Sequence, residues 1–235
     1  MSPSKSQPAA QSEPRFHTLA QFLAQRFGKP MYRIALDAGS TCPNRDGTKG
    51  FGGCTYCDVE GSGTGAFKSG DDIAQQLNLG LKRIARRTPK GGVIAYLQSY
   101  SNTYVKKERL LEVLAPLRPA IADGTIGCLA LATRPDTLPD WSLEILGELR
   151  AQVPVWIELG LESANDRVLE TIKRFHTADD FLRGVERCHS IGLETVGHAI
   201  LGLPGDGRDG ARRTAHLLAA AACSGVKVHN LMILK

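Results

Sequence analysis

The sequence has no apolar run near 18 residues and no signal peptide at its start. The first absence predicts that no segment spans a membrane. The second, together with six cysteines in 235 residues, favours metal binding or catalysis in a reducing compartment over a disulfide framework. We therefore expect a cytoplasmic protein with no membrane partner. The net charge of +5 permits an anionic partner without requiring one.

A fourth nearby metal ligand is also missing. Cys42, Cys54 and Cys57 form the pattern C-x11-C-x2-C, and no other cysteine or histidine lies between His17 and Cys128. Structural zinc takes four protein ligands, whereas three thiolates hold a [4Fe-4S] cluster with one iron open. The pattern favours the cluster. Zinc completed by a distant ligand such as His17 or Cys128 is an alternative, and a disulfide with one free thiol is a weaker one.

Two segments contain few apolar residues that could pack into a core. Residues 1–15 are rich in Ser, Pro, Gln and Ala, and this composition predicts a disordered tail. The stretch GSGTG at residues 61–65 lacks the lysine and the following Ser or Thr of a phosphate-binding loop, so we expect a flexible connection there.

Strand and helix patterns alternate through the rest of the chain. Strands are expected at residues 31–39, 92–100, 126–133, 154–160, 193–201 and 226–234. Helices are expected at residues 16–27, 71–87, 141–150, 166–173, 178–191 and 209–223, with another beginning near Lys106. This order predicts one α/β domain over residues 16–235, an incomplete (β/α)6 barrel whose ligands lie at the carboxyl ends of its parallel strands. Because the chain stops at the sixth strand, we expect a C-terminal truncation.

Basic residues gather at the end of the second expected helix. They are Lys82, Arg83, Arg86, Arg87 and Lys90. Such a run is usually a solvated helix face, and contact with nucleic acid is the alternative.

Four further motifs follow the cysteines in order. They are ATRPD at residues 132–136, IELGLES at 157–163, KRFH at 173–176 and HAILGLPGD at 198–206. With C-x11-C-x2-C, this series resembles the radical S-adenosylmethionine (SAM) superfamily. The resemblance covers residues 33–235 and is strongest to bacterial proteins related to the radical SAM domain of the Elongator catalytic subunit. It is looser to the oxygen-independent coproporphyrinogen oxidases.

The resemblance implies a radical SAM barrel fold, with Cys42, Cys54 and Cys57 as ligands of a [4Fe-4S] cluster. Matching positions imply contacts to SAM from Tyr56, Asn102 beside Ser101, Glu162, Arg174, His198 and Leu203. Carboxylates and cations suit the ribose and carboxylate of SAM. Two alternatives stay open: Glu162 and Arg174 could form an ordinary ion pair, and His198 could be a satisfied core histidine.

The function implied is reductive cleavage of SAM to a 5′-deoxyadenosyl radical that takes a hydrogen atom from a substrate. Kinship with Elongator implies tRNA as partner, with modification of the wobble uridine as the specific expectation. A flavodoxin or ferredoxin is expected as electron donor. The alternatives are a radical SAM enzyme acting on a small molecule and a non-catalytic zinc-binding module.

Overall fold

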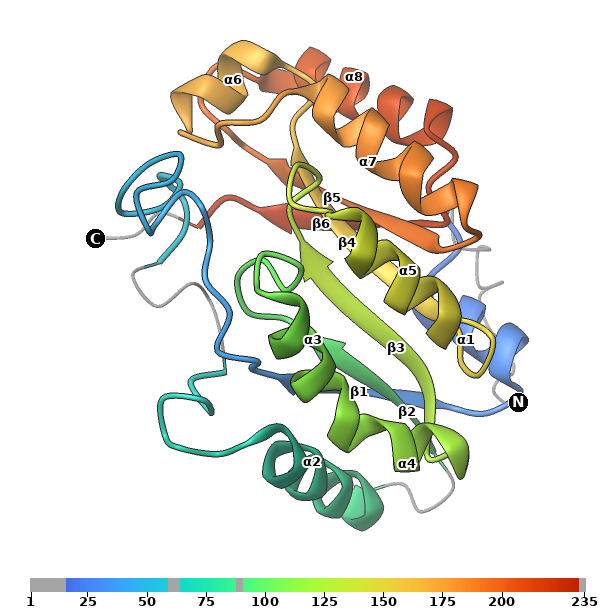
Figure 1. The fold of residues 1–235 in the computed structure, drawn as a ribbon. Helices are drawn as coiled ribbons and strands as arrows, with labels where there is room; N and C mark the ends of the chain where they lie inside the picture. Colours follow the sequence, from blue (N-terminus) through green and yellow to red (C-terminus); the bar gives the residue numbers. More distant parts are fainter. Residues whose placement is uncertain (1–15, 59–63, 88–90, 233–235) are drawn as a thin grey trace, which may run out of the picture.

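Six parallel strands form a single sheet in the computed structural model, which describes residues 16–58, 64–87 and 91–232. The strands pair in sequence order, β1-β2-β3-β4-β5-β6. Figure 1 shows the sheet curled into a half-barrel, with helices on its outer face. The strands are β1 (Met31–Leu36), β2 (Gly92–Leu97), β3 (Ile126–Thr133), β4 (Val155–Glu162), β5 (Glu194–Leu201) and β6 (Gly225–Asn230).

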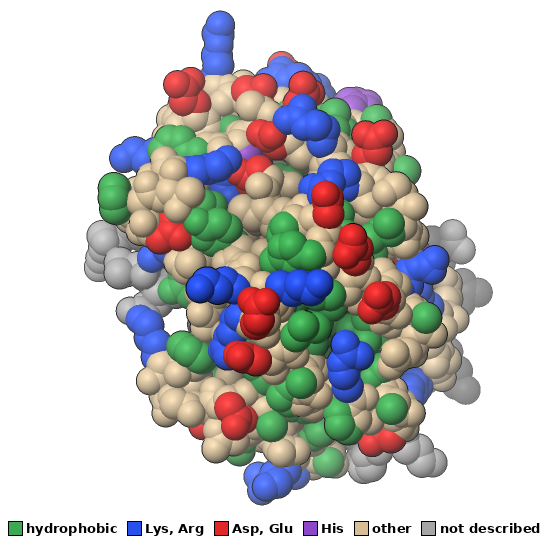
Figure 2. Space-filling model, in the orientation of Figure 1, with side chains coloured by type: hydrophobic (Ala, Val, Ile, Leu, Met, Phe, Trp, Pro, Cys, Tyr) green, Lys and Arg blue, Asp and Glu red, His purple; other side chains and the backbone are tan. Residues whose placement is uncertain are grey.

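Helices connect successive strands, which is what a right-handed parallel arrangement requires, and one further helix precedes β1. They are α1 (Leu19–Phe27), α2 (Ile73–Arg87), α3 (Lys107–Leu114), the short 3-10 turn Ala115–Leu117, α4 (Arg118–Ala122), α5 (Asp140–Leu149), α6 (Asp166–Thr171), α7 (Ala178–Ser190) and α8 (Gly207–Ala220). No described helix is long and apolar enough to cross a bilayer. On the face shown in Figure 2, basic and acidic side chains are interspersed rather than segregated.

The main apolar core lies between the outer face of the sheet and these helices. Strand residues such as Leu97, Leu131 and Ile157 are fully buried there against helix residues such as Leu146 and Phe181. Because side chains alternate across a strand, the intervening residues point into the barrel. The strands therefore leave every second position free to build an interior.

Helix α1 closes the amino-terminal end of that interior. Thr18 and Gln21 form a capping box at its start, and Gly28 ends it in a left-handed conformation with φ 63°. Leu23 packs with Met31 and with Trp156 on the inner face of the sheet. At the opposite end, where the strands finish, the interior is bordered by loops.

The expected barrel is confirmed, with shorter strands. β6 ends at Asn230 rather than at residue 234, and β2 ends at Leu97 rather than at residue 100. The residues that follow β2 turn into a loop held by side-chain hydrogen bonds. The expected tail at 1–15, most of the connection at 61–65, Lys90 and the end of the chain lie outside the described residues.

Candidate active site

The three cysteines lie on the loop that leaves the carboxyl end of β1. All three line a cavity of about 220 Å³ inside the barrel. The Asn44 amide donates to Cys54 Sγ at 3.3 Å, and Arg45 Nη2 donates to Cys57 Sγ at 3.4 Å. Thiols on one loop with N–H groups aimed at two of the sulfurs form a donor set that suits an iron–sulfur cluster.

Proton loss from these thiols is needed before they bind iron. Burial raises the pKa of Cys57, while the hydrogen bond and the charge of Arg45 oppose that rise. Arg45 therefore helps Cys57 to reach its ligating form.

The cysteine loop is fixed to the segment that follows α6. The Asn44 amide also donates to the carbonyls of Lys173 and Arg174, at 2.9 and 3.0 Å. Thr55 donates its backbone N–H to the carbonyl of Ile172 at 3.1 Å. The cysteines and the KRFH segment, more than a hundred residues apart in sequence, thus form one wall of the cavity.

Glu162, the last residue of β4, pairs with Arg174 of that wall. Arg174 Nη2 lies 3.4 Å from Glu162 Oε1 and 3.2 Å from the Gly160 carbonyl, to which it donates. A Cβ at Gly160 would clash with the Arg174 guanidinium and the Glu162 carboxylate, so a larger residue there would displace the pair. Glu162 has φ 70°, a strained conformation for this residue.

His176 holds Arg174 from the other side. Burial, with the charges of Arg174 and Arg134, lowers the pKa of His176 to about 3. Its neutral Nε2 accepts from Arg174 Nε at 2.9 Å. The Arg174 guanidinium is therefore held at Nε by His176 and at Nη2 by the Gly160 carbonyl and Glu162.

Residues of the ATRPD motif line the same cavity and support Arg174. Arg134 is 2 % exposed and donates to Asp136 at 2.9 and 2.8 Å and to the Arg174 carbonyl at 2.9 Å. Lys49 of the cysteine loop also pairs with Asp136. Burial opposes the charge of Asp136, but its two basic partners outweigh that effect and hold its pKa at about 2. This cluster joins three segments of the site.

Four of the six residues expected to contact SAM line the cavity with the cysteines: Tyr56, Glu162, Arg174 and His198. Both alternatives for these residues describe real contacts, because Glu162 pairs with Arg174, and His198 Nε2 lies 2.9 Å from Glu158 Oε2. These pairs nonetheless face the cavity and are placed to meet a ligand there.

Asn102 and Leu203 do not line the cavity. The buried Asn102 amide donates to the carbonyls of Leu97, Ser99 and Ala132, at 2.9 to 3.2 Å. It therefore ties the loop after β2 to β3. Leu203 is buried in an apolar cluster against which Tyr56 packs. Their contact with SAM stays a prediction.

The cavity also has a floor of polar residues, of which only Glu158 and His198 lie within a motif. It contains Tyr96, Glu158, Lys227 and His229, with His198 beside them. Lys227 Nζ donates to Glu158 Oε2 at 3.0 Å and to the Tyr96 hydroxyl at 2.9 Å. Burial works against the charge of Glu158, yet His198 and Lys227 bring its pKa below the usual range. The signal in the sequence was a polar residue at inward positions of apolar strands.

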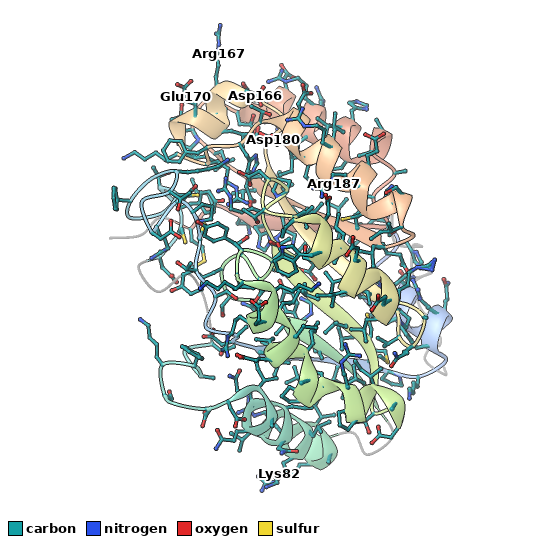
Figure 3. The ribbon with its side chains drawn as sticks, viewed as in Figure 1. Lys82, Asp166, Arg167, Glu170, Asp180 and Arg187 are labelled. Atoms are coloured by element: carbon teal, nitrogen blue, oxygen red, sulfur yellow. The ribbon has the colours of Figure 1, made fainter. Side chains whose placement is uncertain are left out.

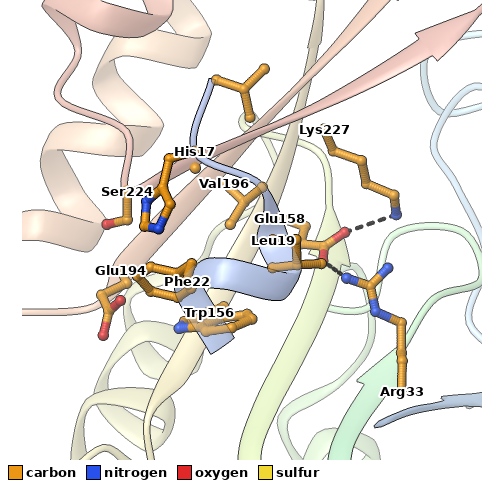
Figure 4. Close-up of a pocket in the computed structure, with 12 residues that line it drawn as sticks. His17, Leu19, Phe22, Arg33, Trp156, Glu158, Glu194, Val196, Ser224 and Lys227 are labelled. Atoms are coloured by element: carbon orange, nitrogen blue, oxygen red, sulfur yellow. Dashed lines mark hydrogen bonds and ion pairs between the residues drawn. The ribbon is translucent and has the colours of Figure 1, made fainter. Parts of the chain in front are cut away.

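A second cavity, of about 300 Å³, lies at the amino-terminal end (Figure 4). Phe22 and His17 line it on the α1 side and Trp156 on the sheet side. Glu158 and Lys227 line both cavities, so this ion pair separates the two.

The distant ligands considered for zinc are not at the cysteine loop. His17 lines the amino-terminal cavity, and Cys128 is buried with Leu23 and Met31 at that same end. Within the described ranges, no three His, Cys, Asp or Glu side chains are grouped to hold a single metal ion, and the three cysteines instead line a cavity of about 220 Å³. All six cysteines are free thiols, so the disulfide alternative is not realised.

A model of the radical SAM superfamily matches residues 41–218, and the chain belongs to this superfamily. It is 37% identical to the uncharacterized protein YtqA of Bacillus subtilis (strain 168) over 232 residues, covering 97% of this chain and 70% of that protein. It is 34% identical to YhcC of Escherichia coli (strain K12) over 217 residues, covering 91% and 67%.

Solved radical SAM structures share the fold. Elp3 of Methanocaldococcus infernus aligns with a TM-score of 0.64 at 14% identity, covering 88% of this chain and 47% of that one. Coproporphyrinogen III oxidase HemN of Escherichia coli gives 0.56 at 17%, covering 88% and 45%. The anSMEcpe structure with bound AdoMet gives 0.58 at 12%, covering 86% and 52%. The chain thus spans about half the length of these neighbours.

Membership overturns the zinc-binding module, because the superfamily consists of enzymes that use a [4Fe-4S] cluster and SAM. The residues present fit both groups. Three thiols suit the cluster, and the Glu162–Arg174 pair suits the polar groups of SAM.

Proposed function

We propose that this protein cleaves SAM reductively and uses the resulting radical to modify a wobble uridine in tRNA. The observation that carries the first half is the single cavity shared by Cys42, Cys54, Cys57 and the Glu162–Arg174 pair. When bound, the cluster and SAM supply a 5′-deoxyadenosyl radical. The chain orients SAM through Glu162 and Arg174 and keeps water from the reacting atoms by burial.

Exposed aromatic rings beside the cavity support RNA as the substrate. Phe51 in the cysteine loop is 82% exposed, and Phe175, next to Arg174, is 43% exposed. Phe175 and Lys173 have φ 56°, a strained conformation for side chains of this size. Single-stranded RNA is commonly bound by stacking its bases on exposed aromatic rings. These two rings lie on the segments that form the wall of the site.

The basic cluster on α2 is less well placed for this role. Lys82 projects outward at the far edge of the molecule in Figure 3, away from α6. Since α2 leads into the start of β2, its final turn with Arg83 and Arg86 lies toward the amino ends of the strands (Figure 1). The cysteine loop is at the other end.

SAM cleavage is tested by anaerobic reconstitution of the full chain with iron and sulfide, followed by SAM and dithionite. We expect 5′-deoxyadenosine by mass spectrometry from the wild type and none from Cys54→Ala. Cluster binding without 5′-deoxyadenosine would refute the first half of the proposal.

The RNA substrate is tested by incubating the reconstituted protein with tRNA from cells lacking its gene, then analysing the wobble nucleosides. We expect a mass change at the wobble uridine that is lost in the double variant Phe51→Ala, Phe175→Ala. The double variant Lys82→Ala, Arg86→Ala, with cations removed at the other end, is the matched control. SAM cleavage with no change in any tRNA nucleoside would favour the small-molecule alternative.

The same proposal includes a flavodoxin or ferredoxin as electron donor and a cytoplasmic location. Free thiols, of which the structure has six, suit a reducing compartment.

A further inference from the structure

The polar floor of the cavity is unexplained by SAM cleavage alone. Its members come from four strands: Tyr96 from β2, Glu158 from β4, His198 from β5, and Lys227 and His229 from β6. Each occupies an inward position, where an apolar side chain would fill the barrel at lower cost in desolvation. A cluster of this kind in the interior points to a ligand that needs it.

Two permanent cations flank the one carboxylate of the floor. Glu158 is 1% exposed and pairs with two permanent cations, Lys227 at 3.0 Å and Arg33 at 3.5 Å. Arg33 faces the amino-terminal cavity, as Figure 4 shows, whereas Lys227 reaches both cavities. Glu158 thus has a cation on each side, and Lys227 is the one that an anion entering this cavity would meet.

Lys227 also has donor capacity to spare. An ammonium group carries three N–H donors, and within the described residues two of them have partners, Glu158 and the Tyr96 hydroxyl. The third is available to a group in the cavity.

His229 supplies a second unfilled contact. Its Nε2 is buried and has no hydrogen-bond partner among the described residues. A buried polar atom without a partner destabilises the folded state, so a ligand that forms a hydrogen bond with it is favoured. Lys227 and His229 are two residues apart on β6, so both side chains point to the same face of the sheet.

We propose that Lys227 and His229 bind an anionic oxygen group, carboxylate or phosphate, on the part of the substrate that enters the barrel. Glu158 is the counter-charge that keeps the Lys227 ammonium at the floor when the site is empty. This inference rests on the proposed function, because it assigns the substrate side of the same cavity.

The inference is tested by calorimetric titration of the reconstituted full chain, with SAM present, at low ionic strength. The probes are acetate, inorganic phosphate and the neutral analogue acetamide. We expect one equivalent of acetate or phosphate to bind and acetamide not to bind. Acetate binding alone identifies a carboxylate, and phosphate binding alone identifies a phosphoryl group.

Three variants locate the anion. Lys227→Met should weaken binding at least about tenfold, since a charged hydrogen bond is lost. Lys227→Arg should restore most of it. The matched control Arg33→Met removes a cation that faces the other cavity and should leave anion affinity within about twofold of wild type. Equal binding by wild type and Lys227→Met, or equal binding of acetate and acetamide, would overturn the inference.

A second assay on the same wild-type preparation distinguishes failure of the proposed function from failure of this inference. If it releases 5′-deoxyadenosine but binds neither anion, the inference fails and SAM cleavage stands. If it releases none, the proposed function fails, and the titration still decides whether the floor binds anions.

Discussion

The two ends of the barrel interior use the same strands in opposite ways. At the carboxyl end, the walls come from loops, and Glu162, Lys173 and Phe175 have strained positive φ angles. At the amino end, one capped helix packs Leu23 against the sheet, and Arg26 pairs with Glu194 through two contacts of 2.5 Å. Strained residues thus lie in the walls that face the candidate ligand site, whereas at the amino end a capped helix covers the interior beside the 300 Å³ cavity.

The largest expected difference between the two ends concerns their cysteine thiols. Cys54→Ala should lose the cluster and all release of 5′-deoxyadenosine, because two remaining thiolates do not replace a three-thiolate site. Cys128→Ala, at the closed end, should keep iron, sulfide and activity near wild-type levels. Iron and sulfide analysis of both variants after reconstitution checks this. Loss of the cluster in Cys128→Ala would end the division of roles between the two ends.

The closed end should dominate stability. Leu23→Ala is expected to lower the free energy of unfolding by about 2–5 kcal/mol, because it leaves a cavity between α1 and the sheet. Leu19→Ala on the same helix, at a residue 51% exposed, should change it by less than about 1 kcal/mol. Urea unfolding followed by circular dichroism measures both. Similar losses in the two variants would show that α1 does not close the barrel by packing.

At the open end, the Glu162–Arg174 pair should govern SAM affinity. Arg174→Lys keeps the charge but loses the planar fork that reaches Gly160 and His176, so SAM should bind about 10–100-fold more weakly. Arg187→Lys, at a surface pair with Asp140, is the control and should bind SAM normally. Equilibrium dialysis with labelled SAM gives both constants. Unchanged affinity in Arg174→Lys would remove this pair from the SAM site.

Asp136, at the open end, should make the free energy of unfolding depend on pH in the acid range. Its pKa is about 2 in the folded protein, against an ordinary value of 3.8. A lowered folded-state pKa contributes stability above the unfolded value, here about 2 kcal/mol, which is lost as the pH falls from about 4 toward 2. The difference in unfolding free energy between wild type and Asp136→Asn should therefore shrink over that range. A difference that stays constant from pH 5 to 2.5 would contradict this account.

Local patterns in the sequence were enough to predict the fold and several residues that line the open end of the barrel. Alternating strands and helices predicted the barrel, since apolar periodicity is a property of neighbouring residues. C-x11-C-x2-C predicted three thiols on one loop for the same reason, and all three line the cavity. Glu162 and Arg174 were found because each lies within a recognisable motif.

Only the tertiary structure decided which polar residues meet. Asn102 follows a strand, as a ligand residue would, yet three backbone carbonyls occupy its amide. Tyr96 and Lys227 lie in strands with no motif around them, Glu158 lies in a motif whose expected contact was Glu162, and curling of the sheet brings the three together. Contacts between strands depend on register and curvature, which no short segment of sequence encodes. The sequence by itself therefore determined the chemistry of the cysteine loop, and the fold determined the charged floor beneath it.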